Sequence, residues 1–114
     1  MSVPLYQAKA ELFRTLGHPA RIRILELLSE REHAVHELLA EIAVEPSNLS
    51  QQLAVLRRAL LVVSRRQDGD VLYALAVPEV REFLLAARQV MGRIAAAQSE
   101  FEAALALDAA KAQW

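Results

Sequence analysis

The sequence contains no cysteine and has only three glycines and four prolines among its 114 residues. The absence of cysteine excludes disulfide bonds, thiolate zinc sites, thiol redox switches and cysteine nucleophiles. With 54% hydrophobic residues, the scarcity of glycine and proline excludes a disordered or linker-rich chain. A chain of this length is typical of one domain, so we expect a single folded domain over residues 1–114.

Long apolar runs are also missing. Aliphatic runs are no longer than that of residues 59–63, whereas a membrane-spanning helix needs about 20 apolar residues. Residues 1–20 lack the basic segment followed by an apolar segment that is typical of a secretory signal. We therefore expect a cytoplasmic protein without a membrane partner.

Acidic and basic residues almost balance, with a formal net charge of −1. This average hides one basic block, because residues 46–67 hold four arginines and no acid. Residues 1–45 hold five basic and seven acidic residues, and residues 68–114 hold four and seven. Since the placement of charge matters more than the total, the block from Pro46 to Gln67 is a candidate nucleic-acid contact.

Hydrophobic periodicity predicts four helices in the first half of the chain. Gly17 is the expected end of the first helix, and Pro19 suits the first turn of the second. A polar connection over residues 30–33 precedes the third helix, and three or four residues separate the third from the fourth. The predicted helices cover approximately residues 5–16, 20–29, 35–42 and 46–59.

The pattern then changes to that of a β-hairpin. Two runs of β-branched and aromatic residues, 61–66 and 71–76, surround the sequence Gln67-Asp68-Gly69-Asp70. Asp-Gly favours a hairpin turn because both residues tolerate positive φ. Pro78 is expected to start a long helix. The expected fold is mainly α with a β-hairpin wing (α+β), a winged helix-turn-helix of order α-α-α-α-β-β-α. In it, residues 35–60 form the helix-turn-helix, residues 61–76 the wing, and residues 1–17 and 78–112 the flanking helices.

The fourth predicted helix has one apolar and one unusual polar face. Leu49, Leu53, Leu56 and Leu60 form a predicted buried stripe. The opposite face carries no acid, and apart from one arginine it is uncharged; its members are Ser47, Asn48, Gln51, Ala54, Val55 and Arg58. Short amides and hydroxyls can read base edges in the major groove, and arginines beyond the first turns can reach phosphates. We therefore expect Arg57 and Arg58 to contact phosphate.

The predicted hairpin offers a second contact through Arg65 and Arg66, where a wing lies along the DNA backbone. Charged residues that protect an edge strand from aggregation are the alternative interpretation. Asp68 and Asp70 at the tip repel phosphate, so the base of the wing is expected to touch DNA.

Four segments in this order resemble the ArsR/SmtB family over about residues 5–77. They are Thr15-Leu-Gly-His-Pro-Ala-Arg-Ile-Arg-Ile-Leu25, Val35-His-Glu-Leu38, Pro46-Ser-Asn-Leu-Ser-Gln-Gln-Leu-Ala-Val-Leu-Arg-Arg58 and Gly69-Asp-Val-Leu-Tyr73. Members of that family are dimeric bacterial winged-helix repressors that release operator DNA when an inducer binds. The resemblance implies that double-stranded operator DNA is the partner, read by Ser47, Asn48, Ser50, Gln51 and Gln52. The operator sequence and the inducer stay open.

The resemblance also implies a homodimer formed through the first and last helices, and the residues support it. The last helix is apolar along most of its length, and an exposed apolar stripe of that size usually marks an interface. Packing of this helix wholly on its own chain is the alternative. The expected interface residues are Leu5, Leu12, Phe13, Leu16, Phe83, Val90, Met91, Ile94 and Phe101.

The sequence departs from the metal-sensing members of that family. Ala34 and His36 stand where those members carry a Cys-x-Cys pair, and the last helix has no histidine for their second site. A site at His33 and His36 is chemically possible for zinc or nickel, but surface histidines are the better interpretation. His18 is expected to cap or pack between helices. We therefore expect no metal and no cofactor.

Catalytic motifs are missing as well, since no glycine-rich phosphate loop and no His-Glu-x-x-His motif occurs. The expected function is a sequence-specific DNA-binding regulator, a repressor on an inverted repeat, and not an enzyme. Two alternatives stay open: a metal-responsive repressor that uses His33 and His36, and a winged-helix protein-interaction module that no longer binds DNA.

Overall fold

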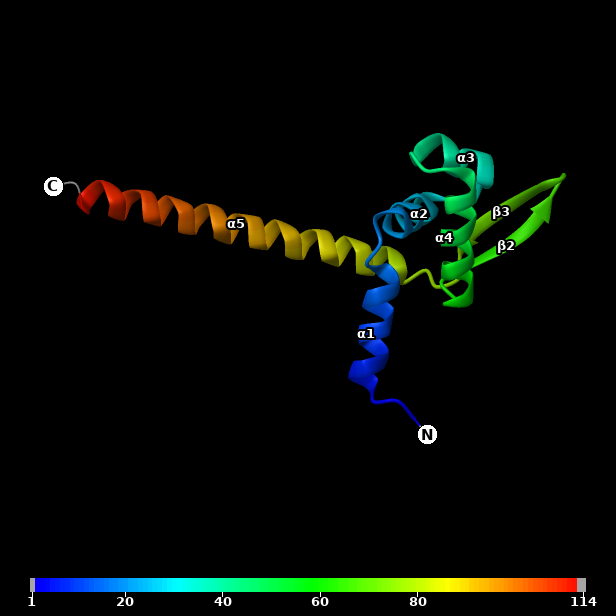
Figure 1. Cartoon of the computed structure of the whole chain (residues 1–114), viewed down its shortest axis with the longest axis horizontal. Helices are drawn as coiled ribbons and strands as arrows, with labels where there is room; N and C mark the ends of the chain where they lie inside the picture. The colour runs from blue at the N-terminus through cyan, green and yellow to red at the C-terminus, as the bar shows by residue number, and fades with distance from the viewer. Residues whose placement is uncertain (1, 113–114) are drawn as a thin grey trace. The chain divides into compact units, whose positions relative to one another are not determined.

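The computed structural model describes residues 2–112, with side chains through residue 108. Its elements follow the order of a winged helix-turn-helix with a β-hairpin wing, which confirms the predicted fold class (Figure 1). The chain divides into two units, one ending at Arg81 and the other beginning at Glu82. The elements are α1 (Leu5–Leu16), α2 (Pro19–Glu30), β1 (His33–Ala34), α3 (Val35–Glu41), α4 (Pro46–Arg58), β2 (Val62–Gln67), β3 (Asp70–Leu75) and α5 (Val80–Ala112).

The connection between α1 and α2 has the predicted residues at its helix ends. Gly17 is the C-cap of α1, and Pro19 is the first residue of α2, where a missing N–H leaves no hydrogen bond unmade. His18 is the N-cap of α2, and its Nδ1 accepts a hydrogen bond from the Ala20 N–H at 3.1 Å. The expected capping role of His18 is therefore confirmed.

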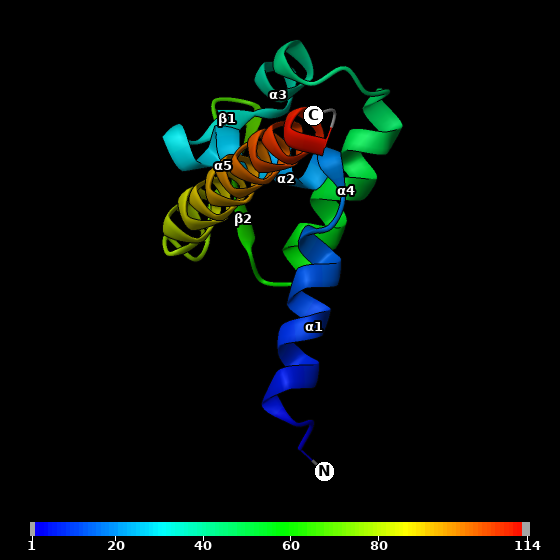
Figure 2. The same cartoon turned by 90° about the vertical axis from the view of Figure 1, so that its left-hand side faces the viewer.

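The wing contains one strand more than expected. β1 forms antiparallel pairs with β3, His33 opposite Tyr73 and Ala34 opposite Leu72, and gives a sheet of order β1-β3-β2. It leads directly into α3 (Figure 2). A strand of two residues shows no alternation, which is why the sequence pattern indicated only a polar connection here.

The tip of the hairpin has the predicted two-residue turn. Gln67 pairs with Asp70, and the two residues between them have positive φ, 50° at Asp68 and 85° at Gly69. Turns with positive φ at both central residues match the right-handed twist of paired strands. The turn therefore fixes the register of the wing, which lies beside α4 (Figure 1).

The core of the first unit is built from one face of each helix. Leu16 at the end of α1 is buried in it, as is Leu27 on α2. Ile22 on the same helix is only half-buried. The largest fully buried side chains are Ile24, Leu25, Leu38, Leu49, Leu53, Leu56 and Val62.

Leu60 was expected in the buried stripe of α4, and this prediction was wrong. Helix α4 ends at Arg58, and Leu60 lies beyond it with a positive φ of 64°. Because the chain leaves the helical path there, the Leu60 side chain is 75% exposed. Leu61 and Val62 are buried in its place.

Helix α5 crosses the boundary between the two units. Its first residues belong to the first unit, where Val80 is buried and the Arg81 Nε donates a hydrogen bond to the Ser29 carbonyl at 2.7 Å. Beyond them the described side chains of α5 are almost all exposed. Within residues 2–112, no helix is both long and apolar enough to cross a membrane.

Candidate nucleic-acid interface

The outer face of α4 is uncharged near its start and well anchored from behind. Leu49, Leu53 and Leu56 are fully buried and hold the helix against the core. Ser47, Ser50 and Gln51 are exposed on the other side. Hydroxyl and amide groups on a rigid helix can donate to and accept from base edges, so this face has the chemistry that major-groove reading requires.

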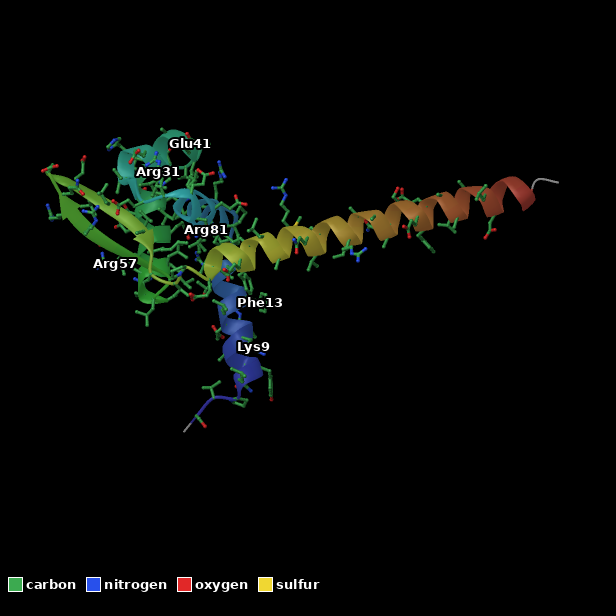
Figure 3. The ribbon with its side chains drawn as sticks, turned by 180° about the vertical axis from the view of Figure 1, so that it is seen from behind. Lys9, Phe13, Arg31, Glu41, Arg57 and Arg81 are labelled. Carbon is green, nitrogen blue, oxygen red and sulfur yellow. The ribbon has the colours of Figure 1, made fainter. Side chains whose placement is uncertain are left out.

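The last turn of α4 carries two exposed arginines. Arg57 and Arg58 follow the uncharged face, and together with Ala54 they line a shallow hollow. Figure 3 labels Arg57 at this end of α4. Neither arginine forms an ion pair with another residue in the part of the chain that the structure describes. Their guanidinium groups are therefore available to an anion such as a phosphate.

Gln52 does not share the surroundings of Gln51. Its side chain is 7% exposed, and both of its polar atoms are occupied. Its Oε1 accepts from Arg21 Nε at 2.8 Å, and its Nε2 donates to Asn48 Oδ1 at 2.8 Å. Gln52 was expected to face the bases, and its burial corrects this: it supports Asn48, a half-buried residue at the edge of the polar face.

Arg21 belongs to this site through its contacts behind α4, although the sequence pattern does not indicate it. Besides Gln52, it binds the Thr15 carbonyl at the end of α1 through Nη1, at 3.0 Å. Nothing in a single sequence links residues 21 and 52, which lie 31 positions apart. Only the packing of α2 against α4 brings them together.

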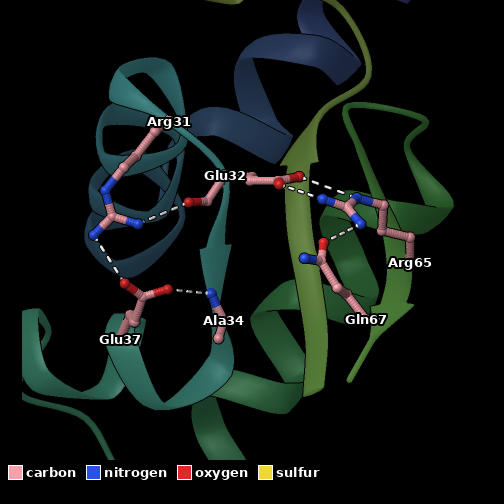
Figure 4. A network of polar contacts seen from close by, with 6 residues as sticks. All are labelled: Arg31, Glu32, Ala34, Glu37, Arg65 and Gln67. Atoms are coloured by element: carbon pink, nitrogen blue, oxygen red, sulfur yellow. Dashed lines mark hydrogen bonds and ion pairs between the residues drawn. The ribbon is translucent and has the colours of Figure 1, made fainter. Parts of the chain in front are cut away.

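The two arginines of the wing have different surroundings. Arg65 forms an ion pair with Glu32 and a hydrogen bond with Gln67 (Figure 4). Arg66 is exposed, and no ion pair or side-chain hydrogen bond involves it among the described residues. Arg65 thus ties the wing to the segment before β1, while Arg66 remains open to a phosphate.

Glu37 fixes the start of α3 through both of its carboxylate oxygens. The Glu37 Oε1 accepts a hydrogen bond from the Ala34 N–H at 2.9 Å, and its Oε2 lies 2.9 Å from Arg31 Nη2 (Figure 4). The Ala34 hydrogen bond, followed by the Arg31 guanidinium, lowers the pKa of Glu37 from 4.5 to about 2. Glu37 therefore stays ionised and holds the first turn of the helix-turn-helix.

The two histidines considered for a metal site lie in different environments. His33 is buried in β1, and its Nδ1 lies 2.9 Å from the Arg31 carbonyl. His36 is exposed on α3. Among the described side chains, no group of three or more His, Cys, Asp or Glu residues has a metal-binding arrangement.

The expected interface residues are exposed, with one exception. Leu16 is buried in its own unit, so it is a core residue, which corrects its assignment to an interface. In the first unit α1 exposes Leu5, Leu12 and Phe13. In the second unit, side chains stand out along α5 (Figure 3), and the exposed apolar ones include Phe83, Val90, Met91, Ile94 and Phe101.

Comparison with known proteins identifies relatives that cover most of the chain. Residues 18–64 match the family model described as bacterial regulatory protein, arsR family. The chain is 55% identical over 94 residues to the uncharacterized HTH-type transcriptional regulator Rv0081 of Mycobacterium tuberculosis, covering 82% of each protein.

Solved structures agree with this result. The crystal structure of Rv0081 aligns with a TM-score of 0.78 at 53% identity, over 85% of this chain and 98% of that one. The transcriptional repressor BigR from Xylella fastidiosa aligns at 0.66 and 33% identity, over 75% and 84%. The homodimeric winged helix-turn-helix DNA-binding domain of Mb0332 from Mycobacterium bovis aligns at 0.68 and 25% identity, over 77% and 82%.

Proposed function

The chain belongs to the arsR family of bacterial DNA-binding transcriptional regulators, and from this premise we propose that it is a homodimeric repressor that binds an inverted-repeat operator through α4. The observation that carries the proposal is the composition of the α4 surface. Exposed Ser47, Ser50 and Gln51 are followed by exposed Arg57 and Arg58, with no acid from residue 46 to residue 67.

Each part of this surface has a role in the proposal. Ser47, Asn48, Ser50 and Gln51 face the base edges, because short polar side chains near the start of a recognition helix reach into the major groove. Arg57 and Arg58 hold the helix on the backbone. Arg66 adds a phosphate contact from the wing, and Arg65 contributes by holding the wing in place through Glu32.

The proposed dimer rests on apolar side chains that each unit leaves exposed. Val90, Met91, Ile94 and Phe101 recur at helical spacing on α5, and Leu5 is exposed on α1. A second copy of the chain would remove this surface from water. Two-fold symmetry matches an inverted repeat, whose half-sites lie about one helical turn apart. BigR is a repressor and the Mb0332 domain is homodimeric, which supports both parts of the proposal.

We infer that the inducing signal is not a metal bound at His33 and His36. The chain has no cysteine, and a buried His33 that lies against a backbone carbonyl is poorly placed to take up an ion together with exposed His36.

The proposal is tested by fluorescence anisotropy with labelled DNA from the region upstream of the gene. The titration is run at two salt concentrations, with and without zinc and nickel. We expect sequence-selective binding that weakens with salt and does not respond to either metal. Absence of selective binding to this DNA and to randomised DNA, with recovery of a protein partner, would favour an interaction module instead.

One substitution directly tests the exposed polar face of α4. We expect Gln51→Ala to cost about 1–3 kcal/mol on the selected operator, because a base contact is lost, and to relax the preference at one position of each half-site. Affinity for random DNA should stay within twofold. A uniform loss on all sequences would assign Gln51 to the backbone instead.

A further inference from the structure

A chain of hydrogen bonds joins the end of α1 to the recognition surface. The Thr15 carbonyl accepts from Arg21 Nη1 at 3.0 Å, and Arg21 Nε donates to Gln52 Oε1 at 2.8 Å. Gln52 Nε2 in turn donates to Asn48 Oδ1, also at 2.8 Å. All four residues belong to the first unit.

Because arginine can only donate hydrogen bonds, it determines which atoms donate and which accept in this series of hydrogen bonds. A guanidinium carries only donors, so the atom of Gln52 that faces Arg21 must be the amide oxygen. The other end of the same amide is then an NH₂ group, which must donate. The atom of Asn48 that faces Gln52 must therefore be its oxygen. Arg21 thus determines the orientation of two successive amides.

The consequence lies at the surface. No hydrogen bond involves the Asn48 Nδ2 within the described residues, and none of their buried side-chain polar atoms lacks a partner. The Asn48 NH₂ group is therefore in contact with solvent, while its oxygen is turned toward Gln52. Asn48 stands in the first turn of α4, from which a recognition helix reaches base edges.

We propose that Arg21 and Gln52 are positioning residues that fix Asn48 as a hydrogen-bond donor toward DNA. This inference rests on the proposed function and deepens it. Asn48 then seeks an acceptor at a base edge, such as guanine N7 and O6 or thymine O4. It does not pair with the amino group of cytosine, which is itself a donor.

Two features keep the orientation fixed. Gln52 is buried, so water does not compete for its amide. Reversing that amide would turn its NH₂ group toward the Arg21 donors, and the resulting loss of a hydrogen bond to a charged group is costly inside a protein. Arg21 is itself held by the backbone carbonyl of Thr15.

The decisive variant is Gln52→Glu. A carboxylate still accepts from Arg21, but its second oxygen can only accept, so the Asn48 amide reverses and donates to it. The oxygen of Asn48 then faces DNA. When operators are selected from randomised DNA, we expect one position of each half-site to change from guanine or thymine, whose major-groove edges offer only acceptors, to cytosine or adenine, whose edges carry an amino donor. The preference at that position should change by about tenfold.

A second variant changes Asn48 itself and tests the same orientation. Asn48→Asp keeps the acceptor for Gln52 and presents only an acceptor outward, so it should shift the same position in the same direction. Gln7→Glu is the matched control, because it adds the same charge on the exposed face of α1 opposite Leu5 and should select the wild-type sequence.

If both variants weaken binding to all DNA sequences alike and leave the selected sequence unchanged, the inference is overturned, because a negative charge added near the phosphates explains that loss whichever way the Asn48 amide is turned.

The inference is overturned if Gln52→Glu keeps the wild-type affinity, selected sequence and melting temperature. If Gln52→Glu melts at a lower temperature than the wild type, the test rests on Asn48→Asp alone. The inference is then overturned if Asn48→Asp keeps the wild-type affinity and selects the wild-type sequence. Failure of the proposed function is a different result, because then the wild-type protein itself selects no sequence.

Discussion

Gln51 and Gln52 are adjacent residues with the same side chain and opposite surroundings. A helix turns by about 100° per residue, so Gln51 projects into solvent while Gln52 lies under the helix. The exposed amide is available to a base, and the buried amide orients Asn48. At the residue scale, the proposed recognition surface therefore depends on groups behind it as well as on the groups that are proposed to face DNA.

Arg58 is expected to contribute affinity without sequence preference. We predict that Arg58→Ala weakens binding to all DNA sequences alike and reduces the slope of log K against log salt by about 0.9, the value for one phosphate contact. Anisotropy titrations at four salt concentrations measure the slope. Arg14→Ala on α1 is the control, since it removes the same charge outside α4. An unchanged slope in Arg58→Ala would show that this side chain does not contact phosphate.

Glu37 should make the stability of the folded protein depend on pH in the acidic range. Its pKa is lowered from 4.5 to about 2 by the Ala34 N–H and Arg31. A lowered pKa in the folded state stabilises the protein above pH 4.5, and this contribution disappears as the pH falls from 4.5 toward 2. We therefore expect Glu37→Gln to lower the melting temperature at pH 7, and the difference from wild type to shrink as the pH approaches 2.

Thermal unfolding followed by circular dichroism measures this difference. Glu41→Gln is a matched control on the same helix, because Glu41 forms no ion pair among the described residues. A difference between wild type and Glu37→Gln that stays constant from pH 7 to pH 3 would contradict the assigned role.

At the scale of elements, the wing depends on its two-residue turn. Gly69 has a φ of 85°, which side chains with a branched Cβ rarely adopt, while asparagine tolerates this region. We predict that Gly69→Val lowers the free energy of unfolding by about 1–2 kcal/mol, and that Gly69→Asn costs less than half of that.

Urea unfolding compares the two variants at a single position, where no neighbouring atom lies within 4 Å of an added Cβ. Equal losses in both variants would mean that the backbone conformation of the turn does not determine the effect.

Most elements could be predicted from the sequence, because their signals are local. The bounds of α1, the proline starts of α2 and α4, and the Asp-Gly turn follow from residues within a few positions of each other. β1 could not be predicted, since a strand of two residues exists only through its pairing with β3. Leu60 was misplaced because the end of α4 lies two residues before it.

The site could be predicted only for the residues that α4 itself exposes. Helical periodicity separates Gln51 from the leucine stripe, and the charge count indicates Arg57 and Arg58. The burial of Gln52 depends on Arg21, and the role of Arg65 depends on Glu32, a partner 33 positions away. Such long-range pairs carry no signal in one sequence.

At the scale of the whole molecule, the proposed dimer depends on the exposed apolar side chains of α5. Met91 and Ile94 are 69% and 55% exposed, and they share a helical face with Phe101. A glutamate in the centre of this face would have to be buried without a counter-ion in a dimer, which is costly. We therefore predict that Ile94→Glu gives a monomer that loses its affinity for the inverted repeat.

Analytical ultracentrifugation measures the mass, and anisotropy measures DNA binding of the same samples. Ala96→Glu is the matched control, because it places the same residue on the opposite face of α5 and should remain dimeric. Dimers of Ile94→Glu with wild-type stability would exclude this face of α5 from the interface.

The central claim is that two copies of α4 read an inverted repeat, and selection of randomised DNA by the purified full-length protein tests it most directly. We predict enrichment of two inverted half-sites whose centres are about one helical turn, roughly 10 base pairs, apart. Enrichment of no sequence, or of one half-site without its inverted copy, would contradict a homodimer that reads DNA through α4.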